Sequence, residues 1–151
     1  MKKIDIAAVP ARRGTAYPAP YDAPCQARER LPLGDAGGLS QFGINLLTLA
    51  PGVWSSQRHW HSHEDEFVFV LEGEATLVTG AGEEILRAGD CAAFKAGEPD
   101  GHHLVNRSDR PVKVLEIGTR DASDGCDYPD IDMVSRPGDD FYCRRDGTPY
   151  R

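Results

Sequence analysis

The sequence predicts a single all-β domain, a sandwich or barrel of antiparallel strands. From Phe42 onward, short segments of roughly four to nine residues are separated by Gly, Pro, Asn or Asp, and they recur roughly every eight to twelve residues. None of these segments shows a sustained helical period of apolar residues. The chain has 151 residues, enough for one well-buried core. These observations favour an all-β fold over a helical or mixed one.

The expected strands are apolar runs bounded by turn residues. FGINLLTLA ends at the turn Pro51-Gly52, and EGEATLVTGAGEEILRAGD is typical of a hairpin that turns at 79–82. The other expected segments are VWSSQRHWH, EFVFVLEG, CAAFKAG, HHLVN and PVKVLEIGT. Inward positions on these strands are expected to line a pocket, with plain core packing as the alternative role for each. They are Phe42 or Ile44, Leu46, Trp54, Val68, Val70, Phe94 and Leu104.

Composition divides the chain into a barrel at 40–120, an N-terminal arm at 1–39 and a C-terminal extension at 121–151, one domain overall. The arm is rich in Pro, Gly and Ala, which disfavours both helix and central strand there. Its Tyr17 and Tyr21 suggest that it lies extended on a surface, and a floppy tail is the alternative. Apolar side chains in the extension could form a short strand and dock the tail: Ile131, Met133, Val134, Phe141 and Tyr142.

Charge and cysteine content limit the partners and the compartment. The net charge is -7 with a pI of about 5.1, and no basic stripe is present, so nucleic acid and anionic lipid are not expected partners. No apolar run reaches the length of a membrane span. Asp5 and Pro10 interrupt the N-terminal stretch, so we expect no signal peptide and a cytoplasmic protein. The four cysteines are far apart and are expected to be free thiols, which disfavours a cysteine-only zinc site.

A histidine cluster in RHWHSHEDEF carries the functional signal. Residues two apart in a strand point to one face, so His59 and His61, or His61 and His63, could each give one nitrogen to a common ion. Glu66 opens the next expected strand and could complete the shell with a carboxylate. A fourth ligand would come from HHLVN, as either His102 or His103. The alternative is a group of solvated or hydrogen-bonded structural histidines; ligand spacing favours a metal site.

Two glycine-anchored patterns surround these residues. The first runs Gly52, six residues, His59-Trp60-His61, four residues, Glu66, six residues, Gly73. The second runs Gly89, five residues, Lys95-Ala96-Gly97, four residues, His102, three residues, Asn106. Over roughly 42–118 these patterns resemble the two motifs of the cupin superfamily. The first gap is one residue longer than the family's, lysine replaces a proline, and two additional residues precede His102.

The resemblance implies a double-stranded β-helix, or jelly roll, of two facing antiparallel sheets. Carried over position by position, it implies that His59, His61, Glu66 and His102 bind a metal. His63 is the alternative to His59, while His103 should face the other way as an outer or core histidine. Cupin barrels also commonly pair through sheet edges and arms, so a homodimer is expected.

Three imidazoles and one carboxylate would leave open positions on an octahedral divalent cation, which could be Fe, Mn, Ni, Co or Zn. Such an ion can act as a Lewis acid, lower the pKa of bound water or activate dioxygen. We therefore expect a metal-dependent enzyme of the dioxygenase, isomerase or lyase type that acts on a small polar or carboxylate molecule. Glu66 is also the candidate catalytic base. A non-catalytic sensor or accessory protein that binds a metal or small ligand is the alternative.

Three further residues have expected roles near this region. Arg58 alternates with the ligands, so it should face away from them and pair with Glu64 or Asp65. Lys95 could meet an anionic substrate, or could simply be solvated. Cys91 lies in an expected strand and should be buried and inert.

Overall fold

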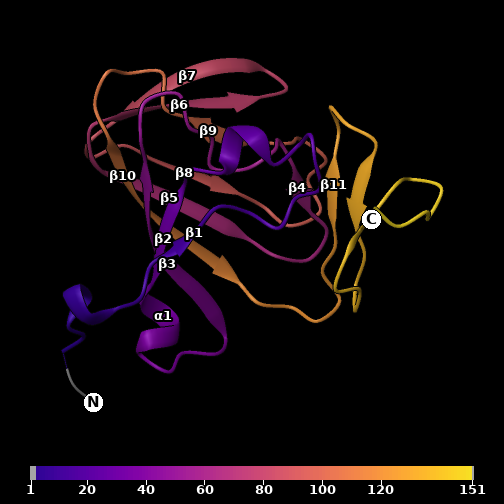
Figure 1. The fold of residues 1–151 in the computed structure, drawn as a ribbon, viewed down its shortest axis with the longest axis horizontal. Coiled ribbons are helices and arrows are strands. Elements are labelled where there is room, and N and C mark those ends of the chain that lie inside the picture. The colour runs from indigo at the N-terminus through magenta and orange to yellow at the C-terminus, as the bar shows by residue number, and fades with distance from the viewer. Residues whose placement is uncertain (1–2, 151) are drawn as a thin grey trace.

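The computed structural model describes residues 3–150, and these form an all-β chain of three sheets (Figure 1). The largest sheet has the order β1-β2-β3-β10-β5-β8. Its strands are β1 Arg12–Arg13, β2 Glu29–Pro32, β3 Phe42–Leu49, β10 Val112–Thr119, β5 Glu66–Glu72 and β8 Cys91–Phe94. A three-stranded sheet has the order β7-β6-β9, formed by β7 Gly82–Arg87, β6 Glu74–Thr79 and β9 His103–Val105. Every pairing within these two sheets is antiparallel, as the sequence predicts.

The main hydrophobic core lies between these two sheets. Apolar residues two apart face inward on each long strand, because successive side chains of a strand point to opposite faces. The larger sheet contributes Leu47, Leu49, Val68, Val70, Val112 and Val114, and the smaller one contributes Ala75, Leu77, Leu86 and Leu104. The predicted hairpin is confirmed, with Thr79 paired to Gly82 across its turn.

The inward face of β3 differs from the prediction. Leu47 and Leu49 are fully buried, whereas Ile44 and Leu46 are only partly buried and Phe42 is exposed. The run is apolar at both parities, so alternation alone did not identify its inner face. The predicted inward positions on this strand were therefore wrong by one residue.

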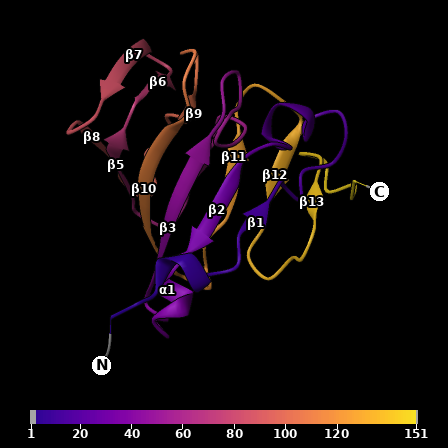
Figure 2. The ribbon, with the colours of Figure 1, turned by 60° about the vertical axis from the view of Figure 1, so that its left-hand side comes forward.

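The N-terminal arm adds strands to the barrel. β2 pairs with β3 from Glu29↔Thr48 to Pro32↔Asn45, and β1 pairs with β2 (Figure 2). A single helical turn, α1 at Leu33–Ala36, follows, and two 3₁₀ turns, Ile6–Ala8 and Ala23–Cys25, precede it. The expectation that this segment holds neither helix nor sheet-interior strand was therefore wrong, although every such element in it is short.

The C-terminal extension forms the third sheet, of order β13-β12-β11-β4, on the right of Figure 1. Its strands are β13 Tyr142–Cys143, β12 Met133–Ser135, β11 Cys126–Tyr128 and β4 Trp60–His61. A second hydrophobic core joins the arm to this sheet and consists of Tyr17, Cys25, Tyr128 and Met133. The surface on which the tyrosine-bearing arm was predicted to lie is therefore the C-terminal extension. Phe141, expected to dock the tail, is exposed. Within residues 3–150, no helix is long and apolar enough to cross a membrane.

Candidate metal centre

Four segments bring the predicted ligands to one end of the barrel. His61 lies on β4, Glu66 is the first residue of β5, and His102 immediately precedes β9. His59 is placed by an isolated antiparallel bridge to His102, in which each backbone nitrogen donates to the other residue's carbonyl, at 3.2 and 2.9 Å. The two histidines of the sequence cluster and the distant one therefore become neighbours through backbone pairing.

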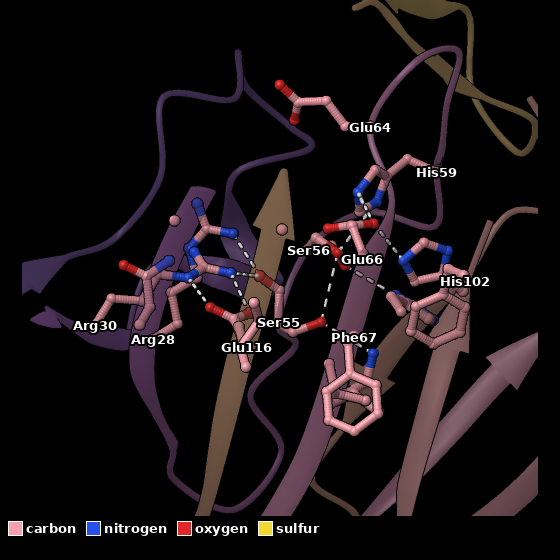
Figure 3. Close-up of a pocket in the computed structure, with 18 of the residues that line it drawn as sticks. Arg28, Arg30, Ser55, Ser56, His59, Glu64, Glu66, Phe67, His102 and Glu116 are labelled. Carbon is pink, nitrogen blue, oxygen red and sulfur yellow. Dashed lines mark hydrogen bonds and ion pairs between the residues drawn. The ribbon is translucent and has the colours of Figure 1, made fainter. Parts of the chain in front are cut away.

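The imidazoles of His59, His61 and His102 converge on the carboxylate of Glu66. Figure 3 shows two of them, His59 and His102, beside Glu66. Oε2 of Glu66 lies 2.7 Å from Nε2 of His102, 3.5 Å from Nε2 of His61 and 3.7 Å from Nε2 of His59. The ring centroid of His59 is 5.0 Å from that of His61 and 5.0 Å from that of His102. Ligand atoms of His59, His61 and Glu66 all lie within 4.8 Å of one another; His102 lies against Glu66, at 2.7 Å, but is not part of this mutually close group of three.

The outer nitrogens of two of these rings have oxygen partners. Nδ1 of His59 lies 2.9 Å from the Gln57 carbonyl, and Nδ1 of His61 lies 2.6 Å from Oδ2 of Asp124. A carbonyl or carboxylate oxygen only accepts, so these partners assign the hydrogen to Nδ1 in the neutral ring. Nε2 of both rings, the atom that carries the lone pair when the ring is neutral, faces Glu66, as in metal-binding histidines.

The residues present fit a divalent cation. Within the described chain, Oε2 of Glu66 is buried and receives no aligned hydrogen bond, although three ring nitrogens surround it. A buried carboxylate oxygen without a donor is rare in folded proteins. A cation bound by Nε2 of His59, His61 and His102 and by Glu66 would satisfy it. Imidazole and carboxylate ligands suit Fe, Mn, Ni, Co and Zn alike, so the ligand set does not select the ion.

Burial and neighbouring charge shift the pKa values in this centre. Burial lowers the pKa of His59 to about 4. Burial opposes ionisation of Glu66 too, but the imidazoles close to its carboxylate outweigh burial and hold its pKa well below the usual range. At neutral pH the metal-free site therefore presents a carboxylate and a neutral His59, the forms in which both bind metals.

The two other histidines have separate roles. His63 is exposed, and its Nδ1 lies 2.8 Å from the Ser62 hydroxyl, so it does not replace His59 in the cluster. His103 is buried, with Nδ1 2.8 Å from the Ser56 carbonyl and its ring edge-on to Trp54. The expectation of a satisfied core histidine agrees with this environment.

Sequence reasoning missed two residues beside His61. Antiparallel pairing of β11 with β4 places Cys126 opposite His61, and Asp124 lies just before β11. Sγ of Cys126 is 3.3 Å from Nδ1 of His61. His61, Asp124 and Cys126 form a second group whose ligand atoms lie within 4.8 Å of one another. Because His61 belongs to both groups, we interpret this second group as the support that orients His61.

A cavity of about 420 Å³ opens on the cluster. Apolar side chains line one part of it: Phe67, Val68, Phe94 and Leu104. Polar side chains line another: Arg28, Arg30, Asn45 and Glu116. Val68, Phe94 and Leu104 were predicted to line the pocket, whereas Val70 is in the main core and Trp54 packs against the second core. On β3, Gly43 and Asn45 face the cavity. Each is one residue away from a predicted position on that strand (Phe42 or Ile44, and Leu46).

Two further predictions near the site were wrong. Arg58 pairs with Asp130 through two bonds of 2.7 Å rather than with Glu64 or Asp65, because the C-terminal extension brings Asp130 beside it. Cys91 lies in β8 as expected but is exposed, since β8 is an edge strand of its sheet. Lys95 is exposed and lies outside the lining of this cavity.

The fold and the site together define a class, a β-barrel with three imidazoles and a carboxylate gathered at a pocket. The family model described as "Cupin domain" matches residues 45–118. With the relatives described next, this match shows that the chain belongs to the cupin superfamily, as its two motifs predicted.

Solved structures extend the comparison. A cupin-superfamily sugar phosphate isomerase from Silicibacter pomeroyi is 45% identical, with a TM-score of 0.94 over 99% of this chain and 97% of its own. A protein from Acidithiobacillus ferrooxidans, provisionally named a sugar phosphate isomerase, is 32% identical, with a TM-score of 0.69 over 82% of this chain and 74% of its own. A polyketide cyclase from Streptomyces resistomycificus shares only the fold, at 20% identity and a TM-score of 0.63 over 79% of each chain. No curated protein matches the chain.

Proposed function

We propose that this protein is a metal-dependent cupin enzyme that isomerises a sugar phosphate. The observation that carries the proposal is the convergence of three Nε2 atoms on the buried Oε2 of Glu66 at the cavity. The choice of isomerase over dioxygenase or lyase is supported by the Silicibacter pomeroyi relative, which is similar over almost the whole of both chains.

His59, His61, Glu66 and His102 would hold the ion in this proposal. A bound divalent cation supplies Lewis acidity toward a substrate oxygen. The remaining tasks fall to the protein's own groups. Asp124 and the Gln57 carbonyl keep the Nδ1 protons of His61 and His59 in place, which holds both Nε2 atoms toward the centre. Phe94 stacks flat on His102 at 3.5 Å between centroids and excludes water from that side.

Glu66 has a second proposed role as the proton acceptor. It is the carboxylate at the centre of the cluster and it lines the cavity, so a substrate bound there would lie within its reach. In this role one oxygen of the Glu66 carboxylate would take the proton from the substrate. Glu66→Asp keeps the carboxylate but shortens its reach, so turnover per bound metal ion should fall if this role is correct.

The test is incubation of the metal-loaded protein with a panel of aldose and ketose phosphates, followed by NMR of the sugars. Protein reconstituted separately with Fe, Mn, Ni, Co and Zn should convert at least one of them, and His61→Ala should abolish the conversion. No conversion with any of the five ions, together with tight binding of one sugar phosphate, would instead indicate a ligand-binding protein. Oxygen uptake by the iron form would favour the dioxygenase alternative.

The protein is also proposed to be a cytoplasmic homodimer. All four cysteines are free, which suits a reducing compartment. Ile85 is a large exposed apolar side chain, and β8 is an edge strand that a second copy could meet. The N-terminal arm pairs with β3 of its own chain. The proposed dimer therefore does not require the two subunits to exchange their arms. Sedimentation at micromolar concentration would test it, and a monomeric mass would contradict it.

A further inference from the structure

Two arginines reach into the cavity from the N-terminal segment. Arg28 immediately precedes β2 and Arg30 lies within it, so the two side chains share one face of the extended chain. Both guanidinium groups donate to the carbonyl of Ser55, Arg30 through Nη2 at 3.1 Å and Arg28 through Nη1 (Figure 3). Ser55 and Ser56 line the same cavity as His59 and Glu66, so the arginine pair and the candidate metal centre open on one space.

The four arginines that line this cavity differ in their partners. Arg30 forms two hydrogen bonds with the carboxylate of Glu116, at 2.7 and 2.9 Å. Arg12 and Arg120 both pair with Asp35. Arg28 is the exception within residues 3–150, since its hydrogen bonds go only to the carbonyls of Gly14, at 2.8 Å, and Ser55. Its guanidinium also lies over the ring of Tyr17, 5.7 Å from the centroid.

Arg28 is therefore a half-buried cation that has no carboxylate partner among residues 3–150. Charges removed from water are normally paired, because the loss of hydration otherwise destabilises the fold. Burial and the adjacent Arg30 both lower the pKa of Arg28. An anion placed against Arg28 would offset both effects. The planar guanidinium fork is suited to two parallel hydrogen bonds with phosphate oxygens.

We propose that Arg28 is the phosphate-binding residue of the substrate pocket, with Arg30 fixed beside it by Glu116. The inference rests on the proposed function in taking the anion to be the phosphoryl group of the sugar phosphate. The cavity of about 420 Å³ falls within the usual range for small-molecule sites. A substrate anchored at Arg28 would extend its sugar toward Glu66.

The first experiment is calorimetric titration of inorganic phosphate into the full chain freed of metal by chelation, so that no ion can bind the anion. The variants are Arg28→Gln and Arg28→Lys, and the control is Arg13→Gln, which removes an exposed arginine outside the cavity lining. Arg28→Gln should weaken phosphate binding about tenfold or more, the size expected when a charge-assisted hydrogen bond is lost. Arg28→Lys should be intermediate because it keeps the charge without the fork.

Unchanged phosphate affinity in a folded Arg28→Gln protein, or no phosphate binding by the wild type at millimolar concentration, would overturn the proposal. Thermal denaturation without phosphate checks that each variant is folded. Acetate and malonate are titrated in the same way for comparison. Binding of these carboxylates in an Arg28-dependent manner, with no response to phosphate, would also overturn the assignment to phosphate.

A second experiment separates this inference from the proposed function. With metal-loaded protein, Arg28→Gln should raise KM for the phosphorylated sugar far more than it lowers kcat. The unphosphorylated sugar, converted poorly by the wild type, should be affected little. Turnover with an unchanged KM in Arg28→Gln would reject Arg28 while the isomerase stands. Arg28-dependent phosphate binding without turnover of any sugar phosphate would support the anion site and reject the isomerase.

Discussion

Nδ1 of His61 lies 2.6 Å from Oδ2 of Asp124, a residue 63 positions later in the chain. The other oxygen of Asp124 accepts the backbone N–H groups of His63 at 2.8 Å and Glu64 at 3.2 Å. One carboxylate therefore orients a candidate ligand and holds the turn between two ligand-bearing strands. This contact ties the C-terminal extension to the candidate metal centre.

Asp124→Asn should weaken metal binding by about 10- to 100-fold, the usual effect of removing the acceptor behind a ligating histidine. Asparagine retains an oxygen for the two backbone N–H groups, so the turn should persist while the charge behind His61 is lost. Competition with a chromogenic chelator measures the affinity. Asp121→Asn is the control, because Asp121 is exposed and, among the residues that the structure describes, its side chain accepts a hydrogen bond only from Ser123 N. Equal metal affinity in wild type and Asp124→Asn would contradict the role assigned to this contact.

Stability of the metal-free protein should depend on pH through His59. The pKa of His59 is about 4 in the folded chain and 6.5 for the unperturbed side chain. As pH falls, the unfolded state takes up this proton first, so stability present above pH 6.5 is lost progressively down to about pH 4. His59→Gln removes the imidazole that takes up this proton, so the variant lacks this contribution to the pH dependence. The free energy of unfolding of the wild type, relative to the variant, should therefore fall over that window.

The expected fall is on the order of 3 kcal/mol, from 1.36 kcal/mol per pKa unit. Urea denaturation of both chelated proteins at pH 7, 6, 5 and 4 measures it. Comparison within the pair removes most contributions from groups that both proteins share. A difference that stays constant across the series, or grows as the pH falls, would show that His59 is not held neutral by burial.

The glycines that open and close the first motif should respond differently to substitution by alanine. Gly73 has φ +80°, and a Cβ there would lie 2.8 Å from the Pro111 carbonyl oxygen. Gly52 has φ +82°, but a Cβ there would meet nothing within 4 Å. Gly52→Ala should lower the free energy of unfolding by about 1 kcal/mol, for backbone strain alone. Gly73→Ala should lower it by about 2–4 kcal/mol because the clash adds to the strain. Equal losses in chemical denaturation would argue against this packing.

Because Leu47 lies in the core between the two sheets and Leu71 does not, their replacement by alanine should change the free energy of unfolding by different amounts. Leu47 is 0% exposed and Leu71 is 48% exposed. Leu47→Ala should lower the free energy of unfolding by about 2–5 kcal/mol, through lost burial and the cavity that remains. Leu71→Ala should change it by less than about 0.5 kcal/mol. Similar values for the two variants in urea denaturation would mean that the face of β3 or β5 has been misassigned.

The fold class and the ligand-bearing segment could be predicted because their signals are local. His59 and His61 alternate, and Glu66 opens the next expected strand, so the sequence grouped these three side chains. In the structure only Trp60–His61 of the expected strand VWSSQRHWH forms a named strand, β4, and β4 pairs with β11 rather than with β5. The inner face of β3 could not be predicted, because Ile44 and Leu46 are as apolar as Leu47 and Leu49. Only the packing of the opposite sheet distinguishes them.

The supporting residues could not be predicted because they depend on long-range pairing. Asp124 and Cys126 reach His61 only when β11 pairs with β4, and nothing in the polar C-terminal extension indicates this partner. Arg28 likewise reaches the cavity because β2, a four-residue strand in a proline-rich segment, pairs with β3. A strand of two to four residues has too few alternating apolar and polar positions to be recognised in a sequence, so its pairing is known only from the tertiary structure.

Crystallography of the metal-reconstituted protein, with anomalous data collected on both sides of the metal edge, tests the central claim most directly. One anomalous peak is expected at about 2.0–2.2 Å from Nε2 of His59, His61 and His102 and from a Glu66 oxygen. The peak should be absent in His61→Ala crystals grown under the same conditions. A fully occupied peak elsewhere, or four side chains converging with no ion after reconstitution, would contradict the account.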